Sequence, residues 1–269
     1  YLILLFIKFL LCMKRKELKK ALKNRERLFG GWISYDHSAI AETFALSGFD
    51  FIAIDMEHTP ISLSSAQKLI MITQGYNVSC LPRPVSHSNN YFKPILDSGS
   101  DGLIVQMVNN YAQIEAISNF IKYPPLGERT YGVNRAHSYG LEFDSYVKNW
   151  NEESILIIQI ESQEGVDNIE EITSHPSVDG VMIGPYDLSG SYGIPGDINN
   201  DIIQRASIKV IDACKRNGKS CGTQISEVNL ENTTNVFNLG YTFIIMASDL
   251  FAITKWAKET KNLIIDFKK

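Results

Sequence analysis

Short apolar runs alternate with amphipathic segments along most of the chain, at nearly regular intervals. The runs are continuous and rich in β-branched residues, which is typical of strands buried on both faces of a parallel sheet. They predict strands over residues 28–34, 49–55, 77–83, 101–107, 154–161, 178–184, 219–225 and 241–247. The segments between them predict helices over residues 38–47, 64–74, 88–98, 111–121, 165–174, 201–217, 227–238 and 249–263.

This alternation predicts an α/β fold class, and eight strands with eight helices match a (β/α)8 TIM barrel. A doubly wound open sheet is the alternative, but no G-x-G-x-x-G turn follows the first strand. No linker or compositional break divides residues 27–269, so we expect a single barrel domain. Residues 122–151 hold prolines, glycines and aromatics without a predicted element, and we expect an ordered loop that carries function.

Residues 1–26 are predicted to form an N-terminal extension outside the barrel. Residues 1–12 are almost wholly apolar, and a basic stretch follows from Met13 to Arg27. The apolar run is shorter than the about 20 residues that a membrane-spanning helix needs. Its positive charge follows the apolar part, whereas a signal peptide has the charge first. We expect residues 1–12 to lie upstream of a natural start at Met13; the alternative is an interfacial anchor with polybasic support.

The composition is that of a folded chain without an obvious polyanionic partner. The 269 residues are 44% apolar and carry a net charge of −4, which excludes a disordered or collagen-like protein. No concentrated basic face is readable, so we expect no nucleic-acid partner, and no membrane partner is expected either. The four cysteines form no C-x-x-C pair, which favours buried reduced thiols and a cytoplasmic location.

Polar side chains gather where the predicted strands end, which is where a barrel places its chemistry. They are Asp55, Glu57, His58, Arg83, Gln159, Glu161 and Asp187. Glu161 and Asp187 follow neighbouring strands and offer two carboxylates to a Mg²⁺ or Mn²⁺ ion that keeps several waters. The alternative is a pair of salt bridges from these carboxylates to nearby arginines or lysines.

The other candidates each have a chemical and a structural interpretation. His58 is either a general base suited to neutral pH or an ordinary loop histidine. Asp97 either orients and basifies that histidine or only ends a helix. Arg83, held between two prolines, either stabilises an oxyanion or forms an ion pair at the barrel mouth. Gly184 and Pro185 make a tight turn whose backbone N–H groups face a carboxylate if the turn is functional.

Together these segments resemble the HpcH/HpaI aldolase family, the class II pyruvate aldolases of the phosphoenolpyruvate/pyruvate barrel superfamily. The similarity runs from about Arg27 to Trp256 and rests on an ordered set of motifs rather than on one of them. The matching pieces are GFDFIAIDMEHTP (48–60), LPRP (81–84), ILDSGSDGLIVQMV (95–108), YPPLGER (123–129), IIQIESQEGVDNIEEI (157–172) and VDGVMIGPYDLSGSYGIPG (178–196).

The resemblance implies a role for each matching residue. His58 is similar to the catalytic base of a D-x-E-H motif, Asp97 to the carboxylate that raises its basicity, and Arg83 to the arginine that stabilises the enolate. Glu161 and Asp187 are similar to the two protein ligands of a divalent metal, which is Mg²⁺, Mn²⁺ or Co²⁺.

The remaining matches concern the pyruvate moiety. Gln159 and the turn from Gly184 through Pro185 to Tyr186 are similar to contacts with pyruvate. Asp55 is similar to the acid of the D-x-E-H motif that lies behind the residues in contact with the substrate.

The family implies cleavage of a 4-hydroxy-2-oxo acid, such as a 2-dehydro-3-deoxy sugar acid or a 4-hydroxy-2-oxo diacid, to pyruvate and an aldehyde. It also implies a homo-oligomer, a hexamer built from dimers that exchange a C-terminal helix. Two residues depart from the family pattern: Gln106 stands where proline is usual, and Tyr186 where a small residue is usual. Because of these two departures, two alternative functions stay open. One is a lyase or carboligase that acts on another oxo acid or thioester, and the other is a non-catalytic barrel that binds oxo acids.

Overall fold

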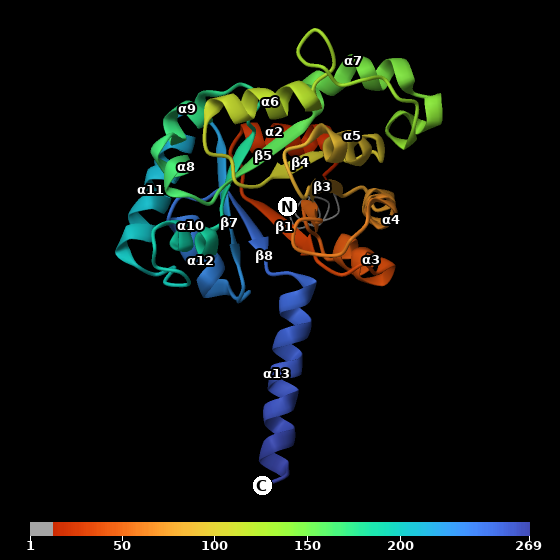
Figure 1. Ribbon diagram of the computed structural model, residues 1–269. Helices are drawn as coiled ribbons and strands as arrows, with labels where there is room; N and C mark the ends of the chain where they lie inside the picture. The colour runs from red at the N-terminus through yellow and green to blue at the C-terminus, as the bar shows by residue number, and fades with distance from the viewer. Residues whose placement is uncertain (1–12) are drawn as a thin grey trace, which may run out of the picture.

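The computed structural model of the protein describes residues 13–269, in which eight parallel strands form a barrel surrounded by helices (Figure 1). The hydrogen-bonded strand order is β3-β2-β1-β8-β7-β6-β5-β4. The strands are β1 (Leu28–Ile33), β2 (Phe51–Asp55), β3 (Ser79–Arg83), β4 (Gly102–Val105), β5 (Ile155–Ile160), β6 (Gly180–Ile183), β7 (Ser220–Ile225) and β8 (Phe243–Met246). The predicted TIM barrel is confirmed, and the open doubly wound sheet is excluded.

The two ends of the strand order, β3 and β4, meet through hydrogen bonds that involve Asp101, the residue before β4. The backbone N–H of Asp101 donates to the carbonyl of Cys80 at 3.0 Å. The N–H of Cys80 donates to the Asp101 side-chain Oδ2 at 2.9 Å. The Asp101 side chain therefore takes the place of a backbone carbonyl in the hydrogen bonding between β3 and β4, and this closes the barrel.

All the predicted helices are present, although the one over residues 165–174 is divided at Asn168. The helices are α2 (Arg15–Lys23), α3 (Ser38–Leu46), α4 (Leu63–Gly75), α5 (Asn89–Asp97), α6 (Tyr111–Ile121), η1 (Arg135–Gly140), α7 (Phe143–Glu153), α8 (Gln163–Asp167), α9 (Ile169–Ser174), α10 (Pro185–Ser191), α11 (Asp201–Arg216), α12 (Leu230–Asn238) and α13 (Asp249–Phe267). Four of these, α2, η1, α7 and α10, were not expected. In α7 the only buried side chains are Tyr146 and Trp150, one turn apart, so its apolar face is too narrow to stand out in the sequence.

The barrel interior is apolar from the amino-terminal end to the middle of the strands. Its cluster contains Leu28, Trp32, Phe51, Ala53, Leu81, Ile104, Ile155, Ile157, Met182, Phe243 and Ile245. Helix α2 closes this end, because its Leu18 and Leu22 are fully buried in the same cluster. Gly222 makes room for the Phe243 ring, since a Cβ there would lie 2.2 Å from it. Burial of each large apolar side chain contributes about 1.5–3 kcal/mol.

Residues 15–23, within the range predicted as an extension, are thus packed against the barrel. The apolar residues 1–12, with the expected upstream start or interfacial anchor, lie outside the described residues. Among residues 13–269, no helix is both long enough and apolar enough to cross a membrane.

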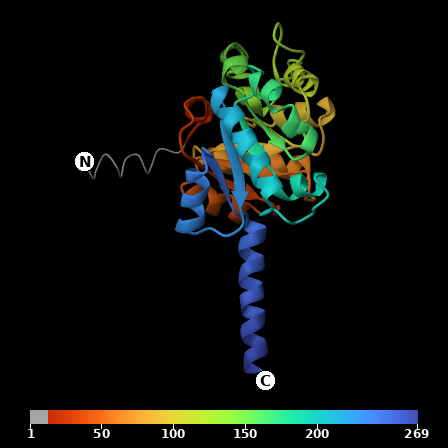
Figure 2. The ribbon, with the colours of Figure 1, turned by 90° about the vertical axis from the view of Figure 1, so that its left-hand side faces the viewer.

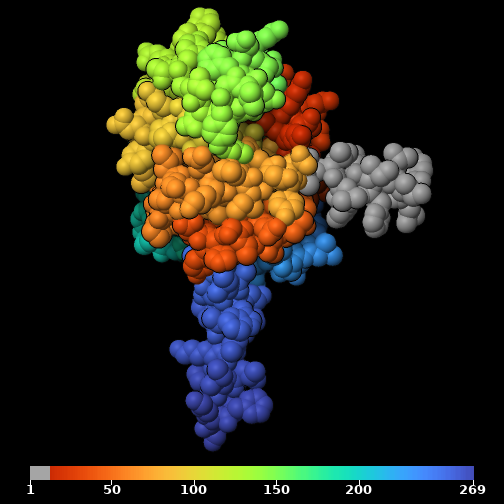
Figure 3. Space-filling view, turned by 90° about the vertical axis from the view of Figure 1, so that its right-hand side faces the viewer, coloured from red at the N-terminus to blue at the C-terminus, as the bar shows by residue number. Residues whose placement is uncertain are grey.

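Helix α13 leaves the barrel and extends away from it as a single helix (Figures 1 and 2). Its first residue, Asp249, is its only buried one and accepts hydrogen bonds from the N–H groups of Ser34 and Tyr35 at 2.8 and 2.9 Å. The rest exposes large apolar side chains, with Trp256 66% and Phe267 86% accessible. The space-filling view shows no other part of the described chain against this face of the helix (Figure 3). The eighth helix therefore does not cover its own barrel.

Candidate active site

The inward-facing positions of the barrel change from apolar to polar at the carboxyl ends of the strands. In β2, the interior residues Phe51 and Ala53 are followed two residues later by Asp55. In β5, the interior Ile157 is followed by Gln159, which is 2% exposed. The carboxyl end of the barrel, which we call the mouth, therefore holds buried polar groups on strands that are otherwise apolar.

Arg83 at the end of β3 is the centre of the mouth. The register of β2 and β3 places Asp55 opposite it, and Arg83 Nη2 lies 2.9 Å from Asp55 Oδ2. Arg83 Nη1 lies 3.0 Å from Glu57 Oε2 and donates to Gln159 Oε1 at 3.4 Å. The guanidinium carbon stands 4.7 Å from the centre of the Trp32 ring. The predicted ion pair exists, and it holds a buried guanidinium in one orientation.

Glu161 lies directly after β5 and is 4% exposed. Its Oε1 accepts a hydrogen bond from Gln159 Nε2 at 2.9 Å, and its Oε2 accepts one from the N–H of Met107 at 3.1 Å. Burial raises the pKa of Glu161 to about 7, against the lowering effects of that N–H and of Arg83. Within residues 13–269 neither Glu161 nor Asp187 forms a salt bridge with arginine or lysine, so the alternative of two salt bridges is not observed.

The turn after β6 brings the second predicted metal ligand to the mouth. Gly184 lies against the Glu161 carboxylate, because a Cβ at Gly184 would stand 2.4 Å from Glu161 Oε1. Pro185 begins α10, and Asp187 lies in its first turn, where its charge contributes to raising the pKa of Glu161. Tyr186 is 67% exposed. The structure thus brings Glu161, Gly184 and Asp187 together, with Tyr186 at the open side.

His58 stands at the rim of the mouth, with 66% of its side chain exposed. Its Nε2 lies 3.6 Å from Glu57 Oε2, and its backbone N–H donates to Asp55 Oδ1 at 3.2 Å. Burial raises the pKa of Glu57, although the charges of Arg83 and His58 lower it. Sequence reasoning noted Glu57 only as a neighbour of His58; its position in the D-x-E-H motif was the signal that could have identified it.

Asp97 has a partner other than His58. Its Oδ1 lies 3.0 Å from Arg129 Nη2, and no contact with His58 is present in the described chain. The buried Arg129 guanidinium also stacks on Tyr123 and Trp150, at 4.7 and 4.5 Å from the ring centres. Asp97 therefore anchors the segment after α6. The expectation of a loop over residues 122–151 was wrong for the part that forms η1 and α7, and its function stays a prediction. The pairing of Asp97 with His58 stays a prediction.

Gln106 belongs to the mouth as well. It follows β4, two residues after the interior Ile104, so the alternation of the strand directs it inward. It is 4% exposed, and its Oε1 has no hydrogen-bond partner among the described residues. A buried amide oxygen without a donor costs about 1–3 kcal/mol, so this group is poised to accept a hydrogen bond from a ligand.

The mouth suits a divalent cation. Glu161 is buried without a cationic partner of its own, and the carboxylates of Asp187 and Glu57 add negative charge beside it. Carboxylate oxygens are hard ligands of the kind that Mg²⁺ and Mn²⁺ prefer. Within residues 13–269 no group of three or more histidine, cysteine or acidic side chains is arranged to hold a metal. Two carboxylates would therefore need water and substrate oxygens to complete the coordination.

Comparison with known proteins agrees with this picture. A family model described as HpcH/HpaI aldolase/citrate lyase matches residues 28–255. The 2-keto-3-deoxy-L-rhamnonate aldolase of Shigella boydii is 34% identical over 206 residues, which cover 76% of this chain and 77% of the relative. The family predicted from the motifs is confirmed, and so is carbon–carbon lyase chemistry of the aldolase type.

Solved structures show the same architecture. A HpcH/HpaI aldolase/citrate lyase family protein from Burkholderia cenocepacia superposes with a TM-score of 0.86 at 26% identity, covering 93% of this chain and 99% of the other. The HpcH/HpaI aldolase of Desulfitobacterium hafniense superposes with a TM-score of 0.83 at 24% identity, covering 92% and 96%.

Proposed function

The chain belongs to the HpcH/HpaI aldolase/citrate lyase family, and we propose that it cleaves a 4-hydroxy-2-oxo acid to pyruvate and an aldehyde with the help of a divalent metal ion. The observation that carries the proposal is the pairing, in one mouth, of unbridged carboxylates on Glu161 and Asp187 with a fixed guanidinium on Arg83. An anionic oxo acid needs both a cation for its chelating oxygens and a positive group for the charge that develops.

Glu161 and Asp187 would hold the metal ion. When bound, a Mg²⁺ or Mn²⁺ ion acts as a Lewis acid that polarises the oxo group and makes the enolate of pyruvate a better leaving fragment. The N–H of Met107 and the amide of Gln159 orient the Glu161 carboxylate for this task. Gly184 leaves space beside the same carboxylate, and its turn provides backbone contacts to the carboxylate of the substrate.

Arg83 stabilises the negative charge on the enolate oxygen. Its two ion pairs, with Asp55 and Glu57, fix the guanidinium before substrate arrives, so little reorganisation is needed during the reaction. The Trp32 ring excludes water from one face of the guanidinium. Preorganised charge of this kind contributes more in a dry site than at an exposed surface.

His58 removes the proton from the C4 hydroxyl. The C3–C4 bond then breaks, its electron pair forms the enolate, and the aldehyde leaves with the new carbonyl group. Glu57, 3.6 Å from the imidazole Nε2, stabilises the protonated histidine. Return of a proton to C3 of the enolate gives pyruvate and restores the base.

Gln106 and Tyr186 define the part of the site that receives the aldehyde. The unpartnered Oε1 of Gln106 is suited to accept a hydrogen bond from a hydroxyl group of the substrate. Tyr186 covers the open side beside Asp187. A polyhydroxylated sugar acid offers such hydroxyl groups, so a substrate like that of the 2-keto-3-deoxy-L-rhamnonate aldolases is favoured over a simple one.

We also propose that the chain is a homo-oligomer built from dimers that exchange α13, up to the hexamer that the family implies. The support is the exposed apolar surface of α13, which includes Trp256 and Phe267 and is left uncovered by residues 13–269. Figure 3 shows the helix standing clear of the barrel. An apolar surface of this kind is a common mark of a protein–protein contact.

The test is pyruvate release from a panel of 4-hydroxy-2-oxo acids that includes 2-keto-3-deoxy-L-rhamnonate, followed with lactate dehydrogenase. We expect turnover that EDTA abolishes and that added Mg²⁺ or Mn²⁺ restores. Absence of EDTA-sensitive pyruvate release across the panel contradicts the aldolase proposal. Release of an oxo acid other than pyruvate, identified by mass spectrometry, favours another lyase of the superfamily.

A further inference from the structure

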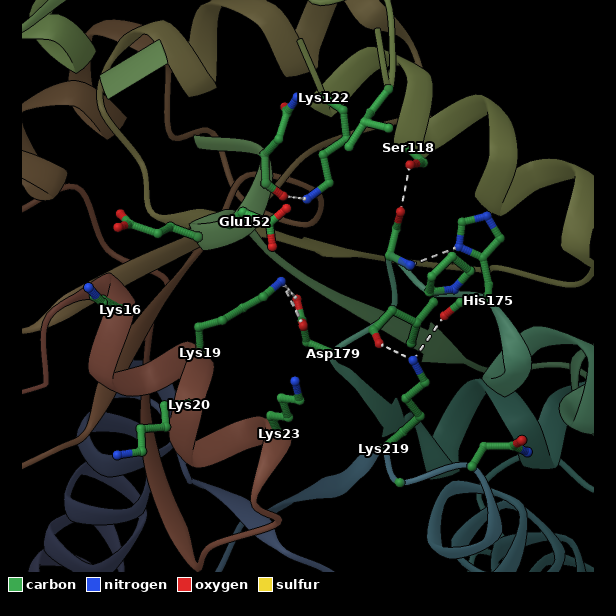
Figure 4. Close-up of a pocket in the computed structure, with 18 of the residues that line it drawn as sticks. Lys16, Lys19, Lys20, Lys23, Ser118, Lys122, Glu152, His175, Asp179 and Lys219 are labelled. Carbon is green, nitrogen blue, oxygen red and sulfur yellow. Dashed lines mark hydrogen bonds and ion pairs between the residues drawn. The ribbon is translucent and has the colours of Figure 1, made fainter. Parts of the chain in front are cut away.

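A cavity of about 1130 Å³ lies at the amino-terminal end of the barrel, opposite the mouth (Figure 4). It is bounded by α2 and by two residues that come directly before strands, Asp179 before β6 and Lys219 before β7. Six lysines line this lysine cavity: Lys16, Lys19, Lys20, Lys23, Lys122 and Lys219. Composition alone gave no sign of it, because the chain is acidic overall.

Of the acids that line the cavity, Asp179 is the one that is paired with one of these lysines. Lys19 Nζ lies 2.8 Å from Asp179 Oδ1 and 2.9 Å from Oδ2. Asp179 Oδ2 also accepts a hydrogen bond from the N–H of Leu156 at 2.9 Å. The pair formed by Lys19 and Asp179 joins α2 to the barrel, and no other lysine of the cavity is hydrogen-bonded to Asp179 within residues 13–269.

The ammonium groups of Lys122 and Lys219 are hydrogen-bonded only to neutral oxygens. Lys219 Nζ donates to the carbonyls of His175 and Val178 at 2.9 and 2.8 Å, and Lys122 Nζ donates to Ser154 Oγ at 2.7 Å and to a backbone carbonyl. An ammonium has three N–H donors, so each keeps one beyond these bonds. Burial lowers the pKa of both groups, for Lys122 to about 8, and the charge of Lys19 lowers both further.

The positive charge inside the cavity is in excess. In Figure 4 the side chains of Lys19 and Lys23 point toward Asp179, whereas those of Lys16 and Lys20 point away from it. Lys23 has no hydrogen-bond or ion-pair partner among the described residues. Of the other acids at the rim, Glu115 pairs with His175 and Glu153 with Arg15; Glu152 remains to offset part of the charge.

We propose that the lysine cavity binds a small multivalent oxyanion, such as a phosphorylated metabolite. Lys23, Lys122 and Lys219 line the cavity from three different parts of the chain, so a multivalent anion can accept hydrogen bonds from more than one ammonium group. Lysine recognises phosphate as a compact point charge in this way. The buried ammonium of Lys122 and the half-buried one of Lys219 are recessed, which suits a soluble ligand better than a flat membrane surface.

A purely structural role explains only part of the cluster. Lys19 fixes α2 to the barrel, but the side chains of Lys122 and Lys219 make no hydrogen bond to α2. Burying an ammonium without a carboxylate is costly, and the cost is offset when an anion is bound. The site lies at the end of the barrel away from Arg83 and Glu161, so occupation of one site leaves the other accessible.

The experiment is isothermal titration of the full-length protein with inorganic pyrophosphate and with sulfate, at low ionic strength and without divalent metal. We expect one pyrophosphate bound per chain, and Lys23→Gln to weaken binding about fivefold to tenfold, because charged hydrogen bonds contribute more than neutral ones. Lys23 is exposed, so its substitution preserves the fold. Lys219→Met, at a half-buried position, is a second variant whose folding is checked by circular dichroism.

The matched control is Lys148→Gln, an exposed lysine of α7 that does not line the cavity. It makes the same change in net charge and should leave the affinity for pyrophosphate within about twofold, because exposed distant charges are screened. No binding to the unmodified protein, or equal weakening by Lys148→Gln and Lys23→Gln, overturns the proposal.

Two further measurements distinguish other ligands and sites. Pyrophosphate binding that excess pyruvate abolishes would place the anion in the mouth and overturn the proposal. Co-sedimentation with vesicles of phosphatidylcholine and phosphatidylglycerol, without pyrophosphate binding, would assign the lysines to a lipid surface and overturn it too. Pyrophosphate binding that is insensitive to pyruvate and to these vesicles supports a soluble anion, whatever the result of the aldolase assay.

Discussion

The two ends of this barrel collect opposite charges by the same structural means. At the mouth, carboxylates surround one arginine, and Arg83 is bonded to Asp55 and Glu57 while Glu161 has no cationic partner of its own. At the other end, lysines surround one carboxylate, and Asp179 is taken up by Lys19. At each end the group of opposite sign is ion-paired, by two carboxylates at the mouth and by one lysine at the other end, and further like charges remain beside it.

Burial acts on these excess charges in the same sense. It raises the pKa of Glu161 to about 7 and lowers that of Lys122 to about 8, because a charged group is less stable away from water. A cation restores the charged form of the first group, and an anion restores that of the second. An unbalanced buried charge, more than its residue type, therefore indicates which ligand an end of the barrel accepts.

The largest effect is expected from Glu161→Gln at the mouth. The variant keeps the shape and one hydrogen-bond acceptor but loses the negative charge, so turnover should fall by at least about 100-fold and no longer respond to EDTA. Pyruvate release and Mn²⁺ binding are measured together. Glu164→Gln, an exposed acid of α8, is the control and should keep full activity. Unchanged turnover in Glu161→Gln would remove this residue from the site.

Arg83→Lys tests whether orientation or mere charge matters at the mouth. Lysine keeps the charge but lacks the planar guanidinium that bonds to Asp55 and Glu57 together, so kcat should fall about 10²-fold with a smaller change in KM. Steady-state kinetics with the best oxo acid give the two constants, and thermal unfolding checks the fold. A lysine variant with an unchanged kcat would show that a fixed guanidinium is not required.

The sequence was sufficient to predict the barrel and the position of the polar strand ends at the mouth, because both depend on the local alternation of residues along each strand. Strand alternation directs Asp55, Gln159 and Glu161 inward, and all three lie where the pattern predicts. The partner of Asp97 was not predictable, since Arg129 reaches it from a loop that is distant in the sequence. The same is true of Lys122, whose burial depends on loops and helices that meet only in the folded chain.

The lysine cavity was missed for a similar reason. Its lysines come from α2, the end of α6 and the start of β7, and no sequence window contains more than the α2 group. Net charge averaged over the chain therefore concealed a local excess. The course of α13 was equally undetermined, because its mixed pattern fits a helix packed on its own barrel or on a partner.

Helix α13 is a further difference between the two ends of the barrel. It starts after β8, so it leaves the barrel at the mouth end (Figure 1). Trp256→Glu places a charge on its exposed apolar surface, and we expect an assembled protein to become monomeric or to halve its mass, as measured by light scattering after gel filtration. Lys255→Glu, one residue earlier and 60% exposed at its side chain, is the control. A monomeric unmodified protein would contradict the exchange of α13.

The smallest expected effect is the pH dependence of sulfate binding at the lysine end. Burial and the charge of Lys19 lower the pKa of Lys122 to about 8, against the raising effects of Asp179 and Glu152. Burial also lowers the pKa of Lys219. The Lys122 ammonium is therefore charged below about pH 8 and becomes neutral above it. Sulfate does not titrate here, so its affinity should fall about tenfold between pH 7 and pH 9.

Lys23→Gln should weaken sulfate binding at both pH values by a constant factor, because Lys23 is exposed and its removal leaves the buried ammonium groups to titrate. Lys122→Met should instead flatten the pH profile if the variant folds, as judged by circular dichroism. A sulfate affinity that is constant from pH 7 to pH 9 would mean that no buried ammonium binds the anion. The mouth and the lysine cavity would then differ only in the sign of their surface charge.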